Sequence, residues 1–129
     1  MTKLSVNINK IATIRNARGG NVPNVVLAAQ RIEAFGAEGI TVHPRPDQRH
    51  ITYNDVEELS KMVKTEFNIE GYPNREWLDL IIKANPAQAT LVPDPPGVLT
   101  SNAGWNTLQH GAFLREVLSE LKSHGIRTS

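Results

Sequence analysis

The segment ITVHPRPDQRHI, residues 40–51, gathers two histidines and two arginines in a short stretch of sequence. Apolar and β-branched residues lead into His43, two prolines flank Arg45, and Arg49 and His50 follow. Arginine matches phosphate oxygens with paired hydrogen bonds, and histidine titrates near neutral pH. By itself His43 could be a hydrogen-bonded core histidine, but together the four side chains predict a small-anion site on a stiff loop after a buried strand.

A second polar group follows the first apolar segment, residues 4–8. Asn7, Asn9 and Lys10 lie where that segment ends, and Arg18 precedes two glycines. The asparagines alternate with apolar residues, so they fit either one polar face of a strand or direct contacts to a ligand. Arg18 alone suggests a solvated loop cation, yet glycines beside an arginine also let the backbone approach a phosphate.

Glu70 is a carboxylate inside an expected strand, residues 67–71, where it alternates with apolar Phe67 and Ile69. We expect this short parallel strand to be buried on both faces. A buried carboxylate either gains a partner or has its pKa raised by desolvation. A carboxyl group titrating nearer neutrality suits general acid–base catalysis, so Glu70 is a candidate for proton transfer. A structural ion pair with Arg45 or another cation is the alternative.

Other kinds of site find less support in the sequence. His43 and His50 form no HxH or HExxH pattern and stand beside arginines that would repel a cation, so no metal is expected. No Walker A or GxGxxG fingerprint occurs. Trp77 and Trp105 are far apart, and each is expected to pack rather than to stack on a base.

Short apolar segments alternate with helical patterns along the chain, which predicts parallel βαβ units. We expect strands at residues 4–8, 39–43, 67–71, 88–93 and 126–129, and helices at 24–35, 54–65, 75–84 and through Leu114–Leu121. The connections that follow strands, residues 9–23, 44–53 and 94–106, are long. The long connections therefore lie at the carboxyl ends of the strands, where parallel α/β folds carry their active sites.

The alternation of strands and helices fits two folds, a doubly wound open sheet and a closed (β/α)8 barrel. A complete barrel takes about 250 residues, and this chain of 129 residues supplies four βα units and the start of a fifth strand. We therefore expect residues 1–129 to form one domain that is half of a TIM barrel, with an open five-strand sheet as the alternative.

The composition is that of an ordinary globular chain, with 40% hydrophobic and 21% charged residues and a net charge of +1. The basic residues form no stripe, which argues against nucleic acid or a membrane as partner. The absence of cysteine excludes disulfides and a cysteine nucleophile. Without an apolar signal-peptide core or membrane span, we expect a cytoplasmic protein.

Four segments together resemble the pyridoxine 5′-phosphate synthase family, whose members close the vitamin B6 ring. They are VNINKIATIRNARGG, GITVHPRPDQRHI, FNIEG and TLVPDPPGVLTSNAGW, in the family's order. The resemblance implies a (β/α)8 barrel that assembles as a homo-octamer, with this chain as its N-terminal half. It also implies condensation of 1-deoxy-D-xylulose 5-phosphate with 3-amino-2-oxopropyl phosphate to pyridoxine 5′-phosphate, phosphate and water, without a metal or organic cofactor.

The resemblance assigns roles to individual residues. His43 and Glu70 match proton-transferring residues, and Asn7 and Arg18 match positions that hold the amino-ketone phosphate. The positions that hold the deoxyxylulose phosphate are matched by Asn9, Lys10, Arg45, His50 and Thr100. Residues 94–106 match a loop that closes over bound substrates.

Two departures from the family pattern matter. Many members have Asp-His in place of Asn9-Lys10, although an amide and a cation can still bind a sugar phosphate. The family's second half supplies a further histidine, a glutamate and glycine-rich phosphate contacts, which lie outside residues 1–129.

One alternative function is that of a non-catalytic half-barrel that self-associates or binds a phosphate compound. Another is an aldolase or epimerase barrel using Lys10 as a Schiff base.

Overall fold

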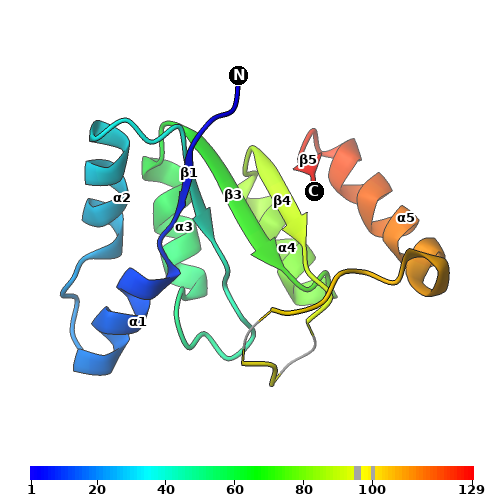
Figure 1. Ribbon diagram of the computed structural model, residues 1–129, viewed down its shortest axis with the longest axis horizontal. Helices are drawn as coiled ribbons and strands as arrows, with labels where there is room; N and C mark the ends of the chain where they lie inside the picture. Colours follow the sequence, from blue (N-terminus) through cyan, green and yellow to red (C-terminus); the bar gives the residue numbers. More distant parts are fainter. Residues whose placement is uncertain (95–96, 100) are drawn as a thin grey trace.

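The computed structural model describes residues 1–94, 97–99 and 101–129. Five strands form one parallel sheet in the order β1-β2-β3-β4-β5 (Figure 1). The strands are β1 (Ser5–Asn7), β2 (Gly39–Val42), β3 (Glu66–Gly71), β4 (Gln88–Leu91) and β5 (Arg127–Thr128), and the helices are α1 (Asn9–Arg18), α2 (Val25–Ala34), α3 (Tyr53–Met62), α4 (Arg75–Ala84) and α5 (Thr107–Ser123).

The strand order decides between the two closures that the sequence leaves open. In a doubly wound sheet the order reverses, so that the first strand lies inside the sheet. Here β1 lies at one edge and each strand pairs with the next along the chain. This sequential winding is that of a (β/α)8 barrel, of which the chain contains four βα units and the start of the fifth strand.

The two faces of the sheet differ in polarity. In β3, Phe67 and Ile69 are buried, whereas Asn68 and Glu70 on the other face are only half-buried. The expectation that this strand is buried on both faces is therefore wrong. The apolar face packs against the helices, of which α3 and α4 lie behind the sheet in Figure 1. The core includes Ile8, Ile40, Val42, Val56, Leu59, Ile69, Ile81 and Leu121.

Residues 9–18 form a helix, and the prediction of a polar loop over residues 9–23 is wrong in this part. Ile8, Ala12 and Arg15 are buried at helical spacing. The stripe is hard to recognise because its last member is an arginine, whose charge is compensated by Asp55. The connection from β1 to α1 is thus the single residue Ile8.

The remaining helices lie close to their predicted positions because their ends carry strong signals. Asn24 and Asn74 accept hydrogen bonds at the starts of α2 and α4, and Thr52 and Asp55 form a reciprocal capping box at α3.

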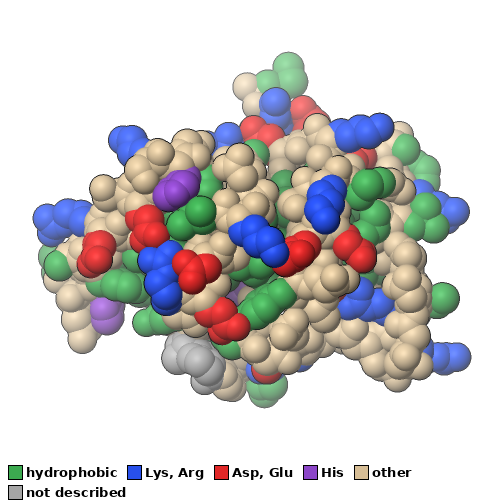
Figure 2. Space-filling view, turned by 180° about the vertical axis from the view of Figure 1, so that it is seen from behind, with side chains coloured by type: hydrophobic (Ala, Val, Ile, Leu, Met, Phe, Trp, Pro, Cys, Tyr) green, Lys and Arg blue, Asp and Glu red, His purple; other side chains and the backbone are tan. Residues whose placement is uncertain are grey.

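Seen from behind in Figure 2, acidic and basic side chains are mixed across the surface. None of the helices in the described part of the chain has the length and apolar character of a membrane span.

Candidate active site

A layer of hydrogen-bonded polar side chains crosses the polar face of the sheet, opposite the apolar face that packs against the helices. Ser5 Oγ lies 2.8 Å from Thr41 Oγ1, and Asn68 Nδ2 donates to the same Thr41 oxygen over 3.2 Å. Thr90 Oγ1 in turn donates to Asn68 Oδ1 over 2.9 Å. These contacts join β1, β2, β3 and β4, so the layer fixes the level of each strand relative to its neighbours.

The same face continues toward the carboxyl ends of the strands with three of the predicted site residues. Two positions beyond Ser5, Thr41 and Asn68 stand Asn7, His43 and Glu70. Side chains two residues apart on a strand share a face. Since Val42 pairs with Ile69, His43 and Glu70 follow at the same level on adjacent strands. The sheet register thus brings the two predicted proton-transferring residues together.

His43 is held by its backbone and stays neutral. Its N–H donates to Asn9 Oδ1 over 2.8 Å, so the asparagine of α1 fixes the end of β2. Burial and the positive charge of Arg45 lower the pKa of His43 to about 4, although Asp94 opposes this shift. A neutral imidazole at pH 7 can accept a proton, as a general base must.

Glu70 is also held by its backbone, while its carboxyl group is shielded from water. Trp77 Nε1 donates to the Glu70 carbonyl over 3.2 Å and packs against Gly71. Burial raises the pKa of the Glu70 carboxyl group, as the sequence predicts. Among the residues that the structure describes, no group hydrogen-bonds this carboxylate and no cation pairs with it. The alternative interpretation, an ion pair between Glu70 and Arg45, is therefore wrong, since both residues lie in the described part of the chain and form no such pair.

A cavity of about 300 Å³ opens beside His43 at the carboxyl ends of the strands. Its lining combines side chains of the loop after β2 with others that follow β3 and β4, namely His43, Arg45, Pro46, Asp47, Arg49, Tyr72, Asp94 and Gly97. The Arg45 guanidinium reaches the loop after β4, where it donates to the carbonyls of Val98 and Leu99. Asp94 accepts a hydrogen bond from Ser101. Thr100, predicted to contact a phosphate, lies outside the described residues.

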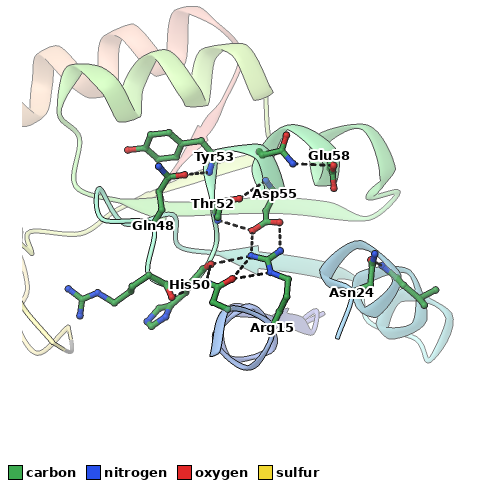
Figure 3. A network of polar contacts seen from close by, with 12 residues as sticks. Arg15, Asn24, Gln48, His50, Thr52, Tyr53, Asp55 and Glu58 are labelled. Carbon is green, nitrogen blue, oxygen red and sulfur yellow. Dashed lines mark hydrogen bonds and ion pairs between the residues drawn. The ribbon is translucent and has the colours of Figure 1, made fainter. Parts of the chain in front are cut away.

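His50 lies against α1 rather than inside this cavity (Figure 3). Its Nδ1 is 3.0 Å from Thr13 Oγ1. Burial and the positive charges of Lys10, Arg45 and Arg49 lower its pKa. Lys10 is exposed on α1 and is close enough to His50 to act on it electrostatically. Lys10, Arg45, Arg49 and His50 therefore share one region.

Two other predicted residues stand apart from the cavity. Asn7 is exposed, and its Oδ1 accepts a hydrogen bond from the Asn9 N–H over 2.9 Å, at the start of α1. Arg18 is the last residue of α1, exposed, and does not line the cavity beside His43. Gly19 follows with a left-handed backbone conformation, φ 69°, so the glycine pair begins as a helix C-cap.

Sequence reasoning missed several residues of the site. The sequence predicts a loop at Arg15 and no individual role for Asn16 or Tyr72, and it gives Asp94 a role only as part of the segment 94–106. Arg15 had a detectable signal, because it completes the buried spacing begun by Ile8. Tyr72 directly follows β3 and Asp94 comes three residues after β4, so both could have been found by examining every polar residue near a strand end.

The fold and site define a singly wound α/β barrel protein with a histidine–glutamate pair and several cations at the carboxyl ends of its strands. The family described as "Pyridoxal phosphate biosynthesis protein PdxJ" matches residues 4–129, and the chain belongs to this family.

Similar proteins named pyridoxine 5′-phosphate synthase occur in Christiangramia forsetii, Bacteroides fragilis and Bacteroides thetaiotaomicron, at 63%, 64% and 63% identity over 129 residues. Each match covers all of this chain and 54% of the relative. The chain thus spans about half the length of the curated relatives it matches.

Proposed function

We propose that this chain is part of a pyridoxine 5′-phosphate synthase, which condenses 1-deoxy-D-xylulose 5-phosphate with 3-amino-2-oxopropyl phosphate. The observation that carries the proposal is the pairing of His43 and Glu70 at one level of the sheet, beside a cavity lined by Arg45. Membership of the family and the names of the relatives support the same reaction. The products are pyridoxine 5′-phosphate, inorganic phosphate and water.

Proton transfer falls to the two shielded groups. Neutral His43 accepts a proton from a substrate carbon or hydroxyl group, because its lowered pKa keeps the lone pair available at pH 7. Glu70, with its raised pKa, exchanges protons with the neighbouring substrate atoms during enolisation and dehydration. The reaction requires such transfers, and these two side chains supply them without a metal or organic cofactor.

Substrate binding falls to the surrounding polar side chains. Arg45 and His50, with Lys10 nearby, hold the phosphate of the deoxyxylulose substrate, and Asn9 and Thr100 contribute to the same substrate. Asn7 and Arg18 hold the amino-ketone phosphate. The Asn9 oxygen already accepts the His43 N–H, so its amide nitrogen is the group that remains for a ligand. An aspartate, common in the family at this position, offers the same acceptor to His43.

The test is turnover by the full-length protein with both substrates. His43→Ala and Glu70→Gln are each expected to lower kcat by roughly 10²- to 10⁴-fold, the usual contribution of a general acid or base. His124→Ala and Glu116→Gln change the same residue types at exposed positions on or beside α5 and are expected to keep wild-type rates. Wild-type turnover in either site variant would contradict its assigned role.

The family resemblance extends the proposal to the assembly and its setting. We propose that residues 1–129 form one domain that belongs to the N-terminal half of the barrel. The complete protein is a cytoplasmic homo-octamer, and its ligands are small phosphorylated compounds. Size-exclusion chromatography with light scattering on the full-length protein measures the octamer directly.

A further inference from the structure

A buried ion pair joins α1 to α3 beneath the loop of residues 43–51. Arg15 Nη1 donates to Asp55 Oδ1 over 2.5 Å, and Nη2 donates to Oδ2 over 2.8 Å. The side chains are only 10% and 6% exposed. Burial alone would raise the pKa of Asp55, but hydrogen bonds from Arg15 and Thr52 outweigh it and lower the pKa. Both groups are therefore charged at neutral pH.

The same guanidinium reaches the loop that carries His50 (Figure 3). Arg15 Nε and Nη2 donate to Asn16 Oδ1 over 3.0 and 2.9 Å, and Nη2 lies 3.5 Å from the His50 carbonyl oxygen. Asn16 Nδ2 then donates to the carbonyls of Arg49 and His50 over 3.0 and 2.8 Å. A continuous set of hydrogen bonds thus runs from Asp55 through α1 to the loop.

Stability alone does not account for these residue types. Removing two charges from water is costly, and well-packed apolar residues commonly replace a buried ion pair without loss of stability. What apolar residues cannot replace is the planar fork of donors, which orients the Asn16 amide toward the two carbonyls. Asn16 itself is exposed, so it contributes little to the core.

We propose that Arg15 and Asn16 are positioning residues, which hold the backbone at Arg49 and His50 so that the loop presents its cations to a phosphate group. Neither residue needs to touch the substrate. The inference rests on the proposed function only for the identity of the ligand, the phosphate of 1-deoxy-D-xylulose 5-phosphate.

The experiment compares Arg15→Lys and Asn16→Ala with wild type in the full-length protein. Lysine keeps a positive charge beside Asp55, so the variant remains folded, but it lacks the fork that orients Asn16. Arg75→Lys is the matched control, because Arg75 pairs with Asp79 and Glu120 at an exposed site. The readouts are kcat, the KM for each substrate, and the Kd for inorganic phosphate.

Both site variants are expected to raise the KM for the ketose phosphate roughly fivefold to tenfold, as loss of about one hydrogen bond's free energy implies. The KM for the amino ketone and kcat stay within twofold, because His43 and Glu70 are untouched. A purely structural role would lower the active fraction, and hence the apparent kcat, without changing either KM.

The two proposals fail in different ways. Absence of turnover in the wild-type protein would contradict the synthase function. The positioning role is then judged by inorganic phosphate alone, whose Kd is expected to rise by the same factor in Arg15→Lys and Asn16→Ala but not in Arg75→Lys. An unchanged Kd and an unchanged ketose-phosphate KM in both site variants would overturn the positioning role.

Discussion

Thr13 contacts one ring nitrogen of His50 and so influences which nitrogen carries the proton. When the Thr13 hydroxyl donates its hydrogen to the Asn9 carbonyl over 3.1 Å, its oxygen accepts from His50 Nδ1–H, 3.0 Å away. In the neutral ring Nε2 is then an acceptor, which a fully ionised phosphate does not favour. With the proton on Nδ1, we therefore expect binding of such an anion to be coupled to protonation of His50.

This linkage gives a prediction about proton uptake. Burial, Lys10, Arg45 and Arg49 lower the pKa of His50 in the free protein, so the ring is neutral at pH 7.5. A bound dianion raises that pKa, so binding takes up a proton and strengthens as the pH falls. Calorimetry with sulfate, which does not itself titrate in this range, in buffers of different ionisation enthalpy measures the uptake. In His50→Gln the uptake is expected to disappear; uptake that persists there would assign the proton to another group.

His43 gives a prediction about stability and pH. Its pKa is about 4 in the folded protein and about 6.5 in an unfolded chain, so between these values the unfolded state binds more protons. The contribution of His43 to the free energy of unfolding is fully present above pH 6.5. As the pH falls toward 4, that free energy decreases by roughly 2 kcal/mol once solvent screening is allowed for. Urea unfolding of wild type and His43→Gln across this range is expected to show a steeper slope for wild type. Equal slopes would contradict the lowered pKa.

At the scale of the elements, the contact between β3 and α4 supports the Glu70 backbone. A Cβ atom built on Gly71 would lie 2.0 Å from Trp77 Nε1. Gly71→Ala therefore displaces the indole that donates to the Glu70 carbonyl, and is expected to cost roughly 2 kcal/mol of unfolding free energy and to lower turnover. Chemical denaturation and kinetic assays measure both effects. Gly111→Ala on α5, where a Cβ meets only the end of the Arg115 side chain at 3.3 Å, is the control and is expected to lower neither.

The elements differ in how well the sequence predicts them. Helices α2, α3 and α4 follow from an apolar stripe that begins directly after Asn24, Thr52 or Asn74, since both the period and the cap are visible in the sequence. Helix α1 was missed because its stripe includes Arg15, and the compensating Asp55 lies 40 residues away. A charge neutralised by a distant partner cannot be recognised from local periodicity.

At the scale of the whole molecule, the sheet ends in two edge strands, β1 and β5. Edge strands present backbone groups that pair readily with another chain. The 129-residue chain by itself is therefore expected to self-associate as its concentration rises, which sedimentation velocity over a concentration series detects. The N–H groups of Arg127 in β5 and of Ser129, which follows it, donate inward to the carbonyls of Ala87 and Ala89, before and within β4. Thr128→Pro removes the intervening outward N–H and is expected to weaken association without breaking the sheet. A monomer at every concentration would contradict this expectation.

The molecule as a whole shows where sequence reasoning ends. Strand and helix spacing indicated parallel βαβ units, but not whether the sheet is singly or doubly wound, because that depends on which strand each crossover reaches. Likewise, the motifs placed His43 and Glu70 at strand ends, and only the pairing of Val42 with Ile69 puts them at one level. The polar layer of Ser5, Thr41, Asn68 and Thr90 was not predicted, since its hydrogen bonds join four separate strands.

The two residues proposed to transfer protons are anchored through main-chain atoms, His43 by the Asn9 oxygen and Glu70 by the Trp77 indole. These anchors do not depend on which side chain stands at either position. Other chemical groups can therefore replace the side chains at positions 43 and 70 without changing the surrounding protein. A genetically encoded 3-methylhistidine or a homologated carboxylate can be introduced there as a chemical probe, and differences in rate would then report reactivity rather than altered geometry.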